Sequence, residues 1–217
     1  MKVPKSFRPN KELEEKIAQL AEGSFRLERA NHITMSNLLK TFQKFVYVSN
    51  EKVLTIDQSY IFGEKLANKL DYTKHDLEEV SSWIKVNNFG ETYQGIYLSA
   101  LVNKIIKEDE EIIIRPINLL SCVGTCLKKG KIIVEDNTDS FTGHRMMGGE
   151  LHIKGDCGVS VGNQMKGGKI IVQGYLDRDV GPAMEGGEIV GYGGIEYISK
   201  SCKGKIFNGK TQIWPHN

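Results

Sequence analysis

The chain has 217 residues, of which 40% are hydrophobic and 26% charged, as in a globular protein of one or two domains. Its 29 basic and 27 acidic side chains give a formal net charge of +2, which disfavours nucleic acid or an anionic membrane as a partner. No signal segment or membrane span is recognisable, and four cysteines are too few for a disulfide scaffold, so we expect a cytoplasmic protein.

Residues 1–110 predict a domain of five helices. Ser36, Asp57 and Thr73 are candidate N-caps, and Asp76 completes a weak capping box with Thr73. We expect this domain to cap a solenoid, because an open coil end exposes unpaired backbone groups. Residues 57–90 could instead form a helix-turn-helix, but they lack a basic face. The expected helices cover residues 11–20, 37–47, 58–70, a segment after Thr73 that Gly90 ends, and 92–107.

Residues 111–217 contain a glycine pattern that returns every 19 residues. This density of glycine disfavours helices, since glycine costs a helix roughly 1 kcal/mol per interior position relative to alanine. At a repeated corner, however, glycine permits positive φ, and the Gly-Gly pairs such as Gly167-Gly168 fit such a bend. The two longest columns consist of Gly124, Gly143, Gly162 and Gly181, and of Gly130, Gly149, Gly168 and Gly187.

Apolar columns share the period of the glycines. Since alternate residues of a strand face the same way, two of these columns should stack inward as ladders. A fixed period near 20 residues is typical of a solenoid, and strands with tight corners predict a parallel β-helix of 19-residue coils. A less regular coil is expected to place Ile113 beside Ile132, and Ile206 should follow Ile189 after a slipped spacing of 17. The columns are Ile132, Leu151, Ile170 and Ile189; Val134, Ile153 and Val172; Leu127, Met146, Met165 and Met184; and Val123, Thr142, Val161 and Val180.

The repeating unit Met-x-Gly-Gly-x-Ile-x-Val-x-Gly, seen best in residues 165–174, resembles the GXGXG domain. That domain closes the large chain of glutamate synthase and forms much of an accessory subunit of formylmethanofuran dehydrogenase. The resemblance covers residues 112–210 and implies a right-handed, single-stranded parallel β-helix with a scaffolding role. With the helices expected in residues 1–110, the fold class is an α+β protein, an all-α domain followed by this β-helix. The resemblance implies a non-catalytic accessory component of a redox enzyme complex.

Two cysteines are the principal candidates for metal binding. Cys122 and Cys126 could share a zinc ion or an iron–sulfur cluster if Gly124 turns the chain between them. In an extended strand, however, residues four apart are separated by about 13 Å, and Cys157 and Cys202 belong to other columns. Two buried thiols are therefore the favoured interpretation, and no cofactor is expected.

Other polar groups in the repeat are weaker candidates for chemistry. His144-Arg145, Asn163-Gln164 and Pro182-Ala183 share one position in successive coils, which would make a polar groove there. One histidine without a carboxylate in that column disfavours acid–base catalysis. The glycine cluster at residues 191–194 lacks the strand and helix of a nucleotide loop. Five aspartates after the strands are expected to be turn residues, with calcium as the alternative: Asp136, Asp139, Asp156, Asp177 and Asp179.

We therefore expect a structural module that binds a protein partner or a second copy of itself. Two alternatives remain open: a regulatory module acting through the helices, and an enzyme with a site where the helices meet the first coils. That site would use Tyr93, Tyr97, Cys122 or Cys126. A scaffold should expose a broad, flat, apolar patch, whereas an enzyme should have a deep pocket in which polar groups converge.

Overall fold

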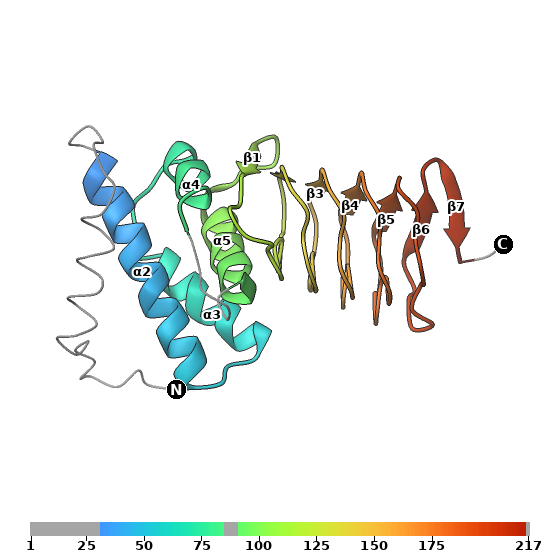
Figure 1. The fold of residues 1–217 in the computed structure, drawn as a ribbon, viewed down its shortest axis with the longest axis horizontal. Coiled ribbons are helices and arrows are strands. Elements are labelled where there is room, and N and C mark those ends of the chain that lie inside the picture. The colour runs from blue at the N-terminus through green and yellow to red at the C-terminus, as the bar shows by residue number, and fades with distance from the viewer. Residues whose placement is uncertain (1–30, 85–90, 216–217) are drawn as a thin grey trace.

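The computed structural model describes residues 31–84 and 91–215, and it confirms an α+β fold that ends in a parallel β-helix (Figure 1). The helices are α2 (Asn31–Glu51), α3 (Ile56–Ala67), α4 (Lys74–Ser81) and α5 (Glu91–Ile105). One sheet follows, with the strands in chain order: β1 (Glu111–Ile114), β2 (Lys131–Val134), β3 (Glu150–Ile153), β4 (Lys169–Val172), β5 (Glu188–Gly191), β6 (Lys205–Asn208) and β7 (Thr211–Trp214).

The helix boundaries confirm one expected cap and correct two others. Thr73 caps α4, and its hydroxyl accepts from Asp76 N at 3.2 Å, as the capping box predicts. The prediction for Asp57 is wrong, because Thr55 caps α3 and forms its own box with Gln58. Ser36 is not a cap either, since α2 already begins at Asn31. The helix expected at residues 11–20 and the stop at Gly90 lie outside the described residues.

Helix α5 is the centre of the helical part. It packs against α2, α3 and α4 and also against the first coil of the β-helix, so its apolar residues are buried around most of its circumference. Tyr97 is fully buried among Phe42 and Phe45, and its hydroxyl donates to the carbonyl of Leu38 at 3.1 Å. Among the helices of the described residues, none is long and apolar enough to cross a membrane.

The strands β1 to β6 pair in parallel, and their register confirms the predicted columns. Ile132, Leu151, Ile170 and Ile189 are direct neighbours, and Ile189 pairs with Ile206 as the shortened spacing predicts. The pairing expected for Ile113 is wrong by one residue: Ile112 pairs with Ile132, and Ile113 pairs with Ile133. The first coil needs one extra residue because Ile112 and Ile114 occupy the interior, whereas Ile113 is only half-buried. β7 then pairs antiparallel with β6 and ends the sheet.

The corner glycines have the conformation that the repeat predicts. All eight glycines of the two longest columns have φ between 69° and 92°. At Gly168 a Cβ would also lie 2.7 Å from the carbonyl carbon of Gly148, so the coils approach too closely for any side chain there. A further column of positive φ carries side chains and has no signature in the glycine pattern: Cys126, Arg145, Gln164 and Ala183, with φ between 51° and 55°.

Candidate functional site

Helix α5 closes the open end of the first coil with two polar side chains. The hydroxyl of Ser99 accepts hydrogen bonds from the backbone amides of Gly124 at 2.9 Å and Thr125 at 3.2 Å. Asn103 Nδ2 donates to the carbonyl of Thr125 at 3.2 Å, while its Oδ1 accepts from the amide of Lys128 at 3.3 Å. In later coils the equivalent backbone amides donate to the preceding coil, as the amide of Gly143 does to the carbonyl of Val123. α5 therefore takes the place of a preceding coil.

A second polar contact fastens α3 to the next coil. It consists of Asp57, His144, Arg145 and Asn163, which we call the Asp57 clasp. His144 Nε2 lies 3.2 Å from Asp57 Oδ1, and His144 Nδ1 lies 2.8 Å from Asn163 Oδ1. Arg145 Nη1 donates to Asp57 Oδ2 at 2.5 Å. The imidazole is almost completely buried, whereas the carboxylate is 41% exposed.

The Asp57 clasp supplies the carboxylate that the column of His144 lacked, and sequence reasoning missed it. Asp57 lies in the first turn of a helix 87 residues away, so no spacing rule connects the two. Both ring nitrogens of His144 already have partners, and both oxygens of Asp57 are engaged. A general base needs a nitrogen that can reach the substrate proton. The arrangement is therefore suited to holding the helices on the β-helix.

The two cysteines proposed for metal binding lie near this junction, with Cys122 buried and Cys126 partly buried. Burial, with a smaller contribution from Asp139, raises the pKa of the fully buried Cys122 to about 12. Burial likewise raises the pKa of Cys126 to about 11. Reactive and metal-binding cysteines need an accessible thiolate, which both environments disfavour. Among the side chains that the structure describes, in residues 34–84 and 92–215, no three His, Cys, Asp or Glu form a group that could hold a metal ion.

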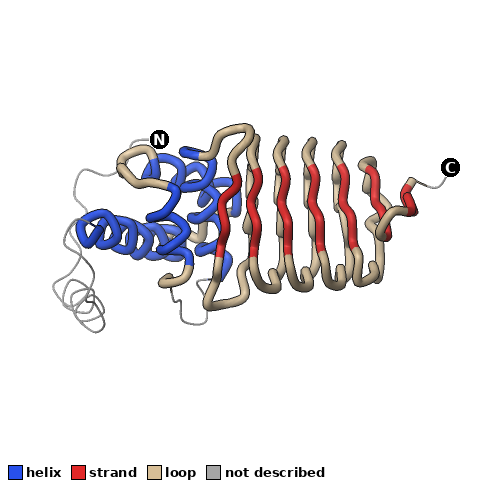
Figure 2. The backbone as a smooth tube through the Cα atoms, turned by 90° about the horizontal axis from the view of Figure 1, so that it is seen from above, coloured by secondary structure: helices blue, strands red, loops and turns tan. Residues whose placement is uncertain are grey.

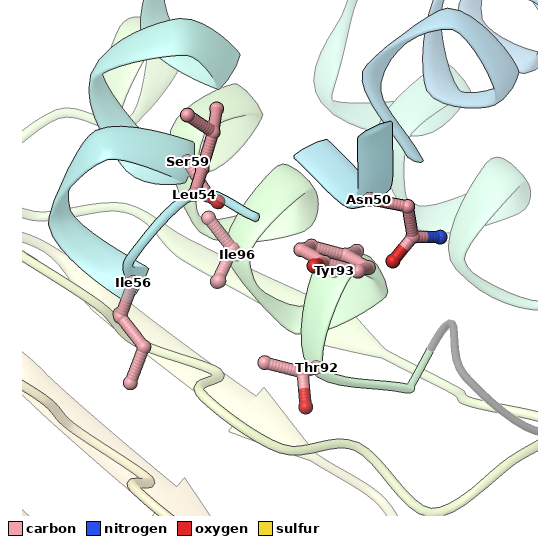
Figure 3. A pocket seen from close by; sticks show the side chains of 7 residues that line it. All are labelled: Asn50, Leu54, Ile56, Ser59, Thr92, Tyr93 and Ile96. Carbon is pink, nitrogen blue, oxygen red and sulfur yellow. The ribbon is translucent and has the colours of Figure 1, made fainter. Parts of the chain in front are cut away.

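The two tyrosines proposed for the junction lie in different surroundings. Tyr97 is enclosed in the helical core, and burial raises its pKa above the ordinary value. Tyr93 instead lines a depression of about 220 Å³ formed by α2, α3, α5 and the α2–α3 connection (Figure 3). This volume is below the roughly 300 Å³ at which ligand pockets begin. The lining residues are all uncharged: Asn50, Leu54, Ile56, Ser59, Thr92, Tyr93 and Ile96.

The aspartates on the connections between coils hold turns. Asp156 Oδ1 accepts from the backbone amide of Tyr175 at 2.7 Å, one coil further on. Asp139 Oδ2 accepts from the hydroxyl of Ser121 at 3.0 Å, one coil before. The other three, Asp136, Asp177 and Asp179, each accept a hydrogen bond from a backbone amide or a serine hydroxyl. These contacts are those of aspartate-stabilised turns.

The outer face of the sheet carries an apolar stripe, which we call the outward stripe. Its members occupy the third position of strands β1 to β6: Ile113, Ile133, His152, Ile171, Val190 and Phe207. Except for Asn208 of β6, which is exposed, the inward residues on either side are buried, whereas five of the six stripe residues remain partly exposed and Val190 is buried. Four of the five apolar members lie outside the buried core, and the fifth is the buried Val190. Figure 2 shows the helices gathered beyond β1, with β2 to β6 side by side.

A charge ladder runs along one side of the outward stripe. It is formed by the first residue of each strand, in the order Glu111, Lys131, Glu150, Lys169, Glu188 and Lys205. The sign therefore changes at every step. Two neighbouring pairs are in contact, with Lys131 Nζ 3.4 Å from Glu111 Oε2 and Lys169 Nζ 3.5 Å from Glu188 Oε2. On the other side of the stripe, Arg115 Nε lies 2.7 Å from Glu135 Oε2.

The fold and these sites define a parallel β-helix that is capped by helices, has a structural polar junction and carries a partly exposed apolar face. Comparison of the chain with protein-family models, with curated proteins and with solved structures gives no match.

Proposed function

We propose that this protein is a non-catalytic assembly module whose outward stripe binds a protein. The observation that carries the proposal is the position of this stripe on a regular sheet. Ile133 and Ile171 are held two rungs apart by the same parallel register that builds the core, and both remain partly exposed. Contiguous exposed apolar surface is typical of protein interaction sites.

The rigidity of the β-helix supports the assembly role. Each of the strands β2 to β5 pairs in parallel with the strands of the coils before and after it, and the corners are closed by glycines at positive φ. The Asp57 clasp and the Ser99 contacts join the helices to this rod. A partner bound to the outward stripe would thus be held at a fixed distance and orientation from the helical part. Such preorganisation lowers the entropic cost of binding.

The arrangement of the polar side chains favours assembly over catalysis at the junction. His144 has partners at both nitrogens, the two candidate cysteines have raised pKa values, and the depression at Tyr93 is lined by uncharged residues. A catalytic site would need a nucleophile or base that faces a pocket. The available groups instead complete structural contacts.

The resemblance of the repeat to the GXGXG domain supports a more specific proposal. The phased columns, such as Met146, Met165 and Met184, are fully buried at one corner of successive coils. We propose that the β-helix is a domain of this type and that the protein belongs to a cytoplasmic redox enzyme complex. This step rests on the resemblance of sequence and on the supposition that the domain keeps its scaffolding role.

Affinity capture from the cells that naturally make the protein tests this function. Wild-type chain and two variants serve as bait, and the recovered chains are identified by mass spectrometry. Ile171→Lys places a charge in the outward stripe, while Met147→Lys makes the same change at a half-exposed corner outside it. We expect wild type and Met147→Lys to recover the same chains in fixed ratio, and Ile171→Lys to lose the chain that binds the outward stripe. Oxidoreductase subunits among the recovered chains would support the more specific proposal.

Two outcomes would contradict the proposal. Equal recovery by all three baits would show that the outward stripe is not the binding surface. Recovery of nothing, not even a second copy of the chain, would show that the protein is not an assembly module. Melting temperatures of the three proteins should be compared first, so that loss of binding is not loss of folding.

A further inference from the structure

We infer that the partner at the outward stripe is a second copy of this chain, packed face to face in the opposite direction. This inference rests on the proposed assembly function and adds the identity of the partner. A two-fold axis parallel to the strands, between β3 and β4, would relate the two copies. It would place β1 opposite the partner's β6, β2 opposite its β5, and β3 opposite its β4.

The charge ladder is complementary to itself under this operation. It has six rungs of alternating sign, so reversing its direction exchanges every glutamate with a lysine. Glu111 would face the partner's Lys205, Lys131 the partner's Glu188, and Glu150 the partner's Lys169. An isologous interface requires this property, because the same patch must serve as both surfaces. An unrelated partner would need to carry a matching pattern of its own.

The outward stripe would supply the mostly apolar centre of the interface, in which His152, 2.7 Å from Glu150 Oε2, would face the partner's Ile171. Under the same axis Ile133 would meet the partner's Val190, and Ile113 would meet the partner's Phe207. Sheets that pack face to face lie about 10 Å apart and bury the side chains between them. Apolar residues at the centre with charges at the rim is the usual arrangement in protein interfaces.

The position of the helices favours two β-helices that run in opposite directions over two that run in the same direction. An axis parallel to the β-helix would bring the two helical parts to the same end. Figure 1 shows that the helices extend the molecule beyond β1, with α4 beside that strand, so they would meet there. In the antiparallel arrangement the helical parts lie at opposite ends, and each faces the region beyond the partner's β6.

The size of the face sets the expected strength of this dimer. Strands of four residues are roughly 13 Å long, and six of them span roughly 29 Å, which gives roughly 380 Å² per copy. Stable interfaces bury about 800 Å² per partner. We therefore expect a reversible dimer that forms at micromolar concentration or above, and the measurement must cover that range.

Sedimentation velocity on the full chain, at concentrations from about 1 to 500 μM, tests the inference. Wild type should shift from monomer to dimer. Glu150→Lys would place a lysine opposite the partner's Lys169, and Lys169→Glu would place two glutamates opposite each other. Each variant alone should dimerise at least about tenfold more weakly than wild type, since like charges across an interface are costly.

Mixing the two variants separates contacts between copies from contacts within one chain. In a mixed dimer, both lysines of one copy face both glutamates of the other, so dimerisation should return to within about threefold of wild type. Within each chain the neighbouring strands still carry like charges, because residues 150 and 169 pair in the register. A purely intramolecular role would therefore leave the mixture as weak as either variant.

A matched control lies on a different corner of the β-helix. Lys166 Nζ lies 3.8 Å from Glu185 Oε2 in the next coil, so Lys166→Glu makes the same reversal outside the face and should dimerise like wild type. A wild-type chain that stays monomeric at about 500 μM, or a mixture that does not recover, overturns the inference. If the chain is monomeric while affinity capture still returns other proteins through Ile171, the assembly function stands and only the identity of the partner is wrong.

Discussion

Asp57 and His144 are 87 residues apart in the sequence, yet Asp57 Oδ1 lies 3.2 Å from His144 Nε2. The contact joins the first turn of α3 to a corner of the β-helix, and Arg145 binds the other carboxylate oxygen. The imidazole is almost completely buried, and the Asp57 carboxylate is the partner of its Nε2. The pair is thus a structural connection between the two parts of the fold.

Removing the carboxylate should therefore destabilise the protein. A buried polar group that loses its partner costs about 1–3 kcal/mol, so we expect Asp57→Ala to lower the free energy of unfolding by about 2 kcal/mol. Asp57→Asn keeps an acceptor and should cost less. Urea denaturation measures both, with Asp71→Ala at an exposed position as the control. If Asp57→Ala behaves like Asp71→Ala, the clasp contributes nothing to stability.

The contacts of Ser99 with the first coil lead to a local prediction. Ser99→Ala removes the acceptor for the amides of Gly124 and Thr125, both of which are buried. We expect a loss of about 2–4 kcal/mol, because two buried donors are left unsatisfied. Hydrogen exchange at these two amides should become faster than at Gly143 N, which bonds to a carbonyl of the preceding coil. Unchanged protection of both amides would contradict the capping role of α5.

The requirement for glycine at the corners can be tested at two positions, one with room for a Cβ atom and one without. Gly168 and Gly194 have φ of 87° and 112°, but a Cβ at Gly168 would lie 2.7 Å from backbone, whereas at Gly194 the nearest atom is 3.5 Å away. Gly194→Ala should cost about 1–2 kcal/mol from backbone strain alone. Gly168→Ala should cost more than about 3 kcal/mol because the adjacent coils must also separate. Equal melting temperatures for the two variants would refute this explanation.

The sequence reveals the β-helix because its structure is periodic. Residues 19 apart occupy equivalent places, so Leu151, Ile170 and Ile189 can be assigned to one inward ladder from the sequence alone. The same argument predicts positive φ at Gly168. Where the repeat is interrupted, the 19-residue spacing predicts the wrong strand pairing. Ile113 is misplaced by one residue because Ile132 follows Ile112 at a spacing of 20, one more than the repeat, and only burial determines that register.

The contacts between the helices and the β-helix cannot be predicted from the 19-residue period. The residue type of Asp57 suggests a helix cap, but Thr55 and Gln58 satisfy the end of α3 and leave Asp57 free to bind Arg145. That partner lies in a different structural unit. The outward stripe also escapes sequence reasoning, because Ile133 and Ile171 sit beside the inward columns and an uninterrupted apolar strand is usually buried on both faces.

The buried thiols make stability depend on alkaline pH. Burial raises the pKa of Cys122 and of Cys157 to about 12, while each is near 9 when exposed in the unfolded chain. Between these values the unfolded state loses the protons that the folded state keeps, so stability is complete below about pH 9 and falls as the pH rises toward about 12. Each thiol contributes up to about 1.4 kcal/mol per pH unit in this window.

Urea denaturation at about pH 8, 9 and 10 measures this dependence. The double variant Cys122→Ala, Cys157→Ala removes both thiols, so its loss of stability between about pH 9 and pH 10 should be smaller than that of wild type by roughly 2 kcal/mol. The raised pKa values of Tyr60 and Tyr72 act in the same direction and remain in both proteins, so they cancel in the difference. Cys202→Ala is a milder control, because Cys202 is less deeply enclosed and its pKa is raised less strongly. If wild type and the double variant lose stability in parallel, the thiols ionise without unfolding, and burial does not keep them protonated.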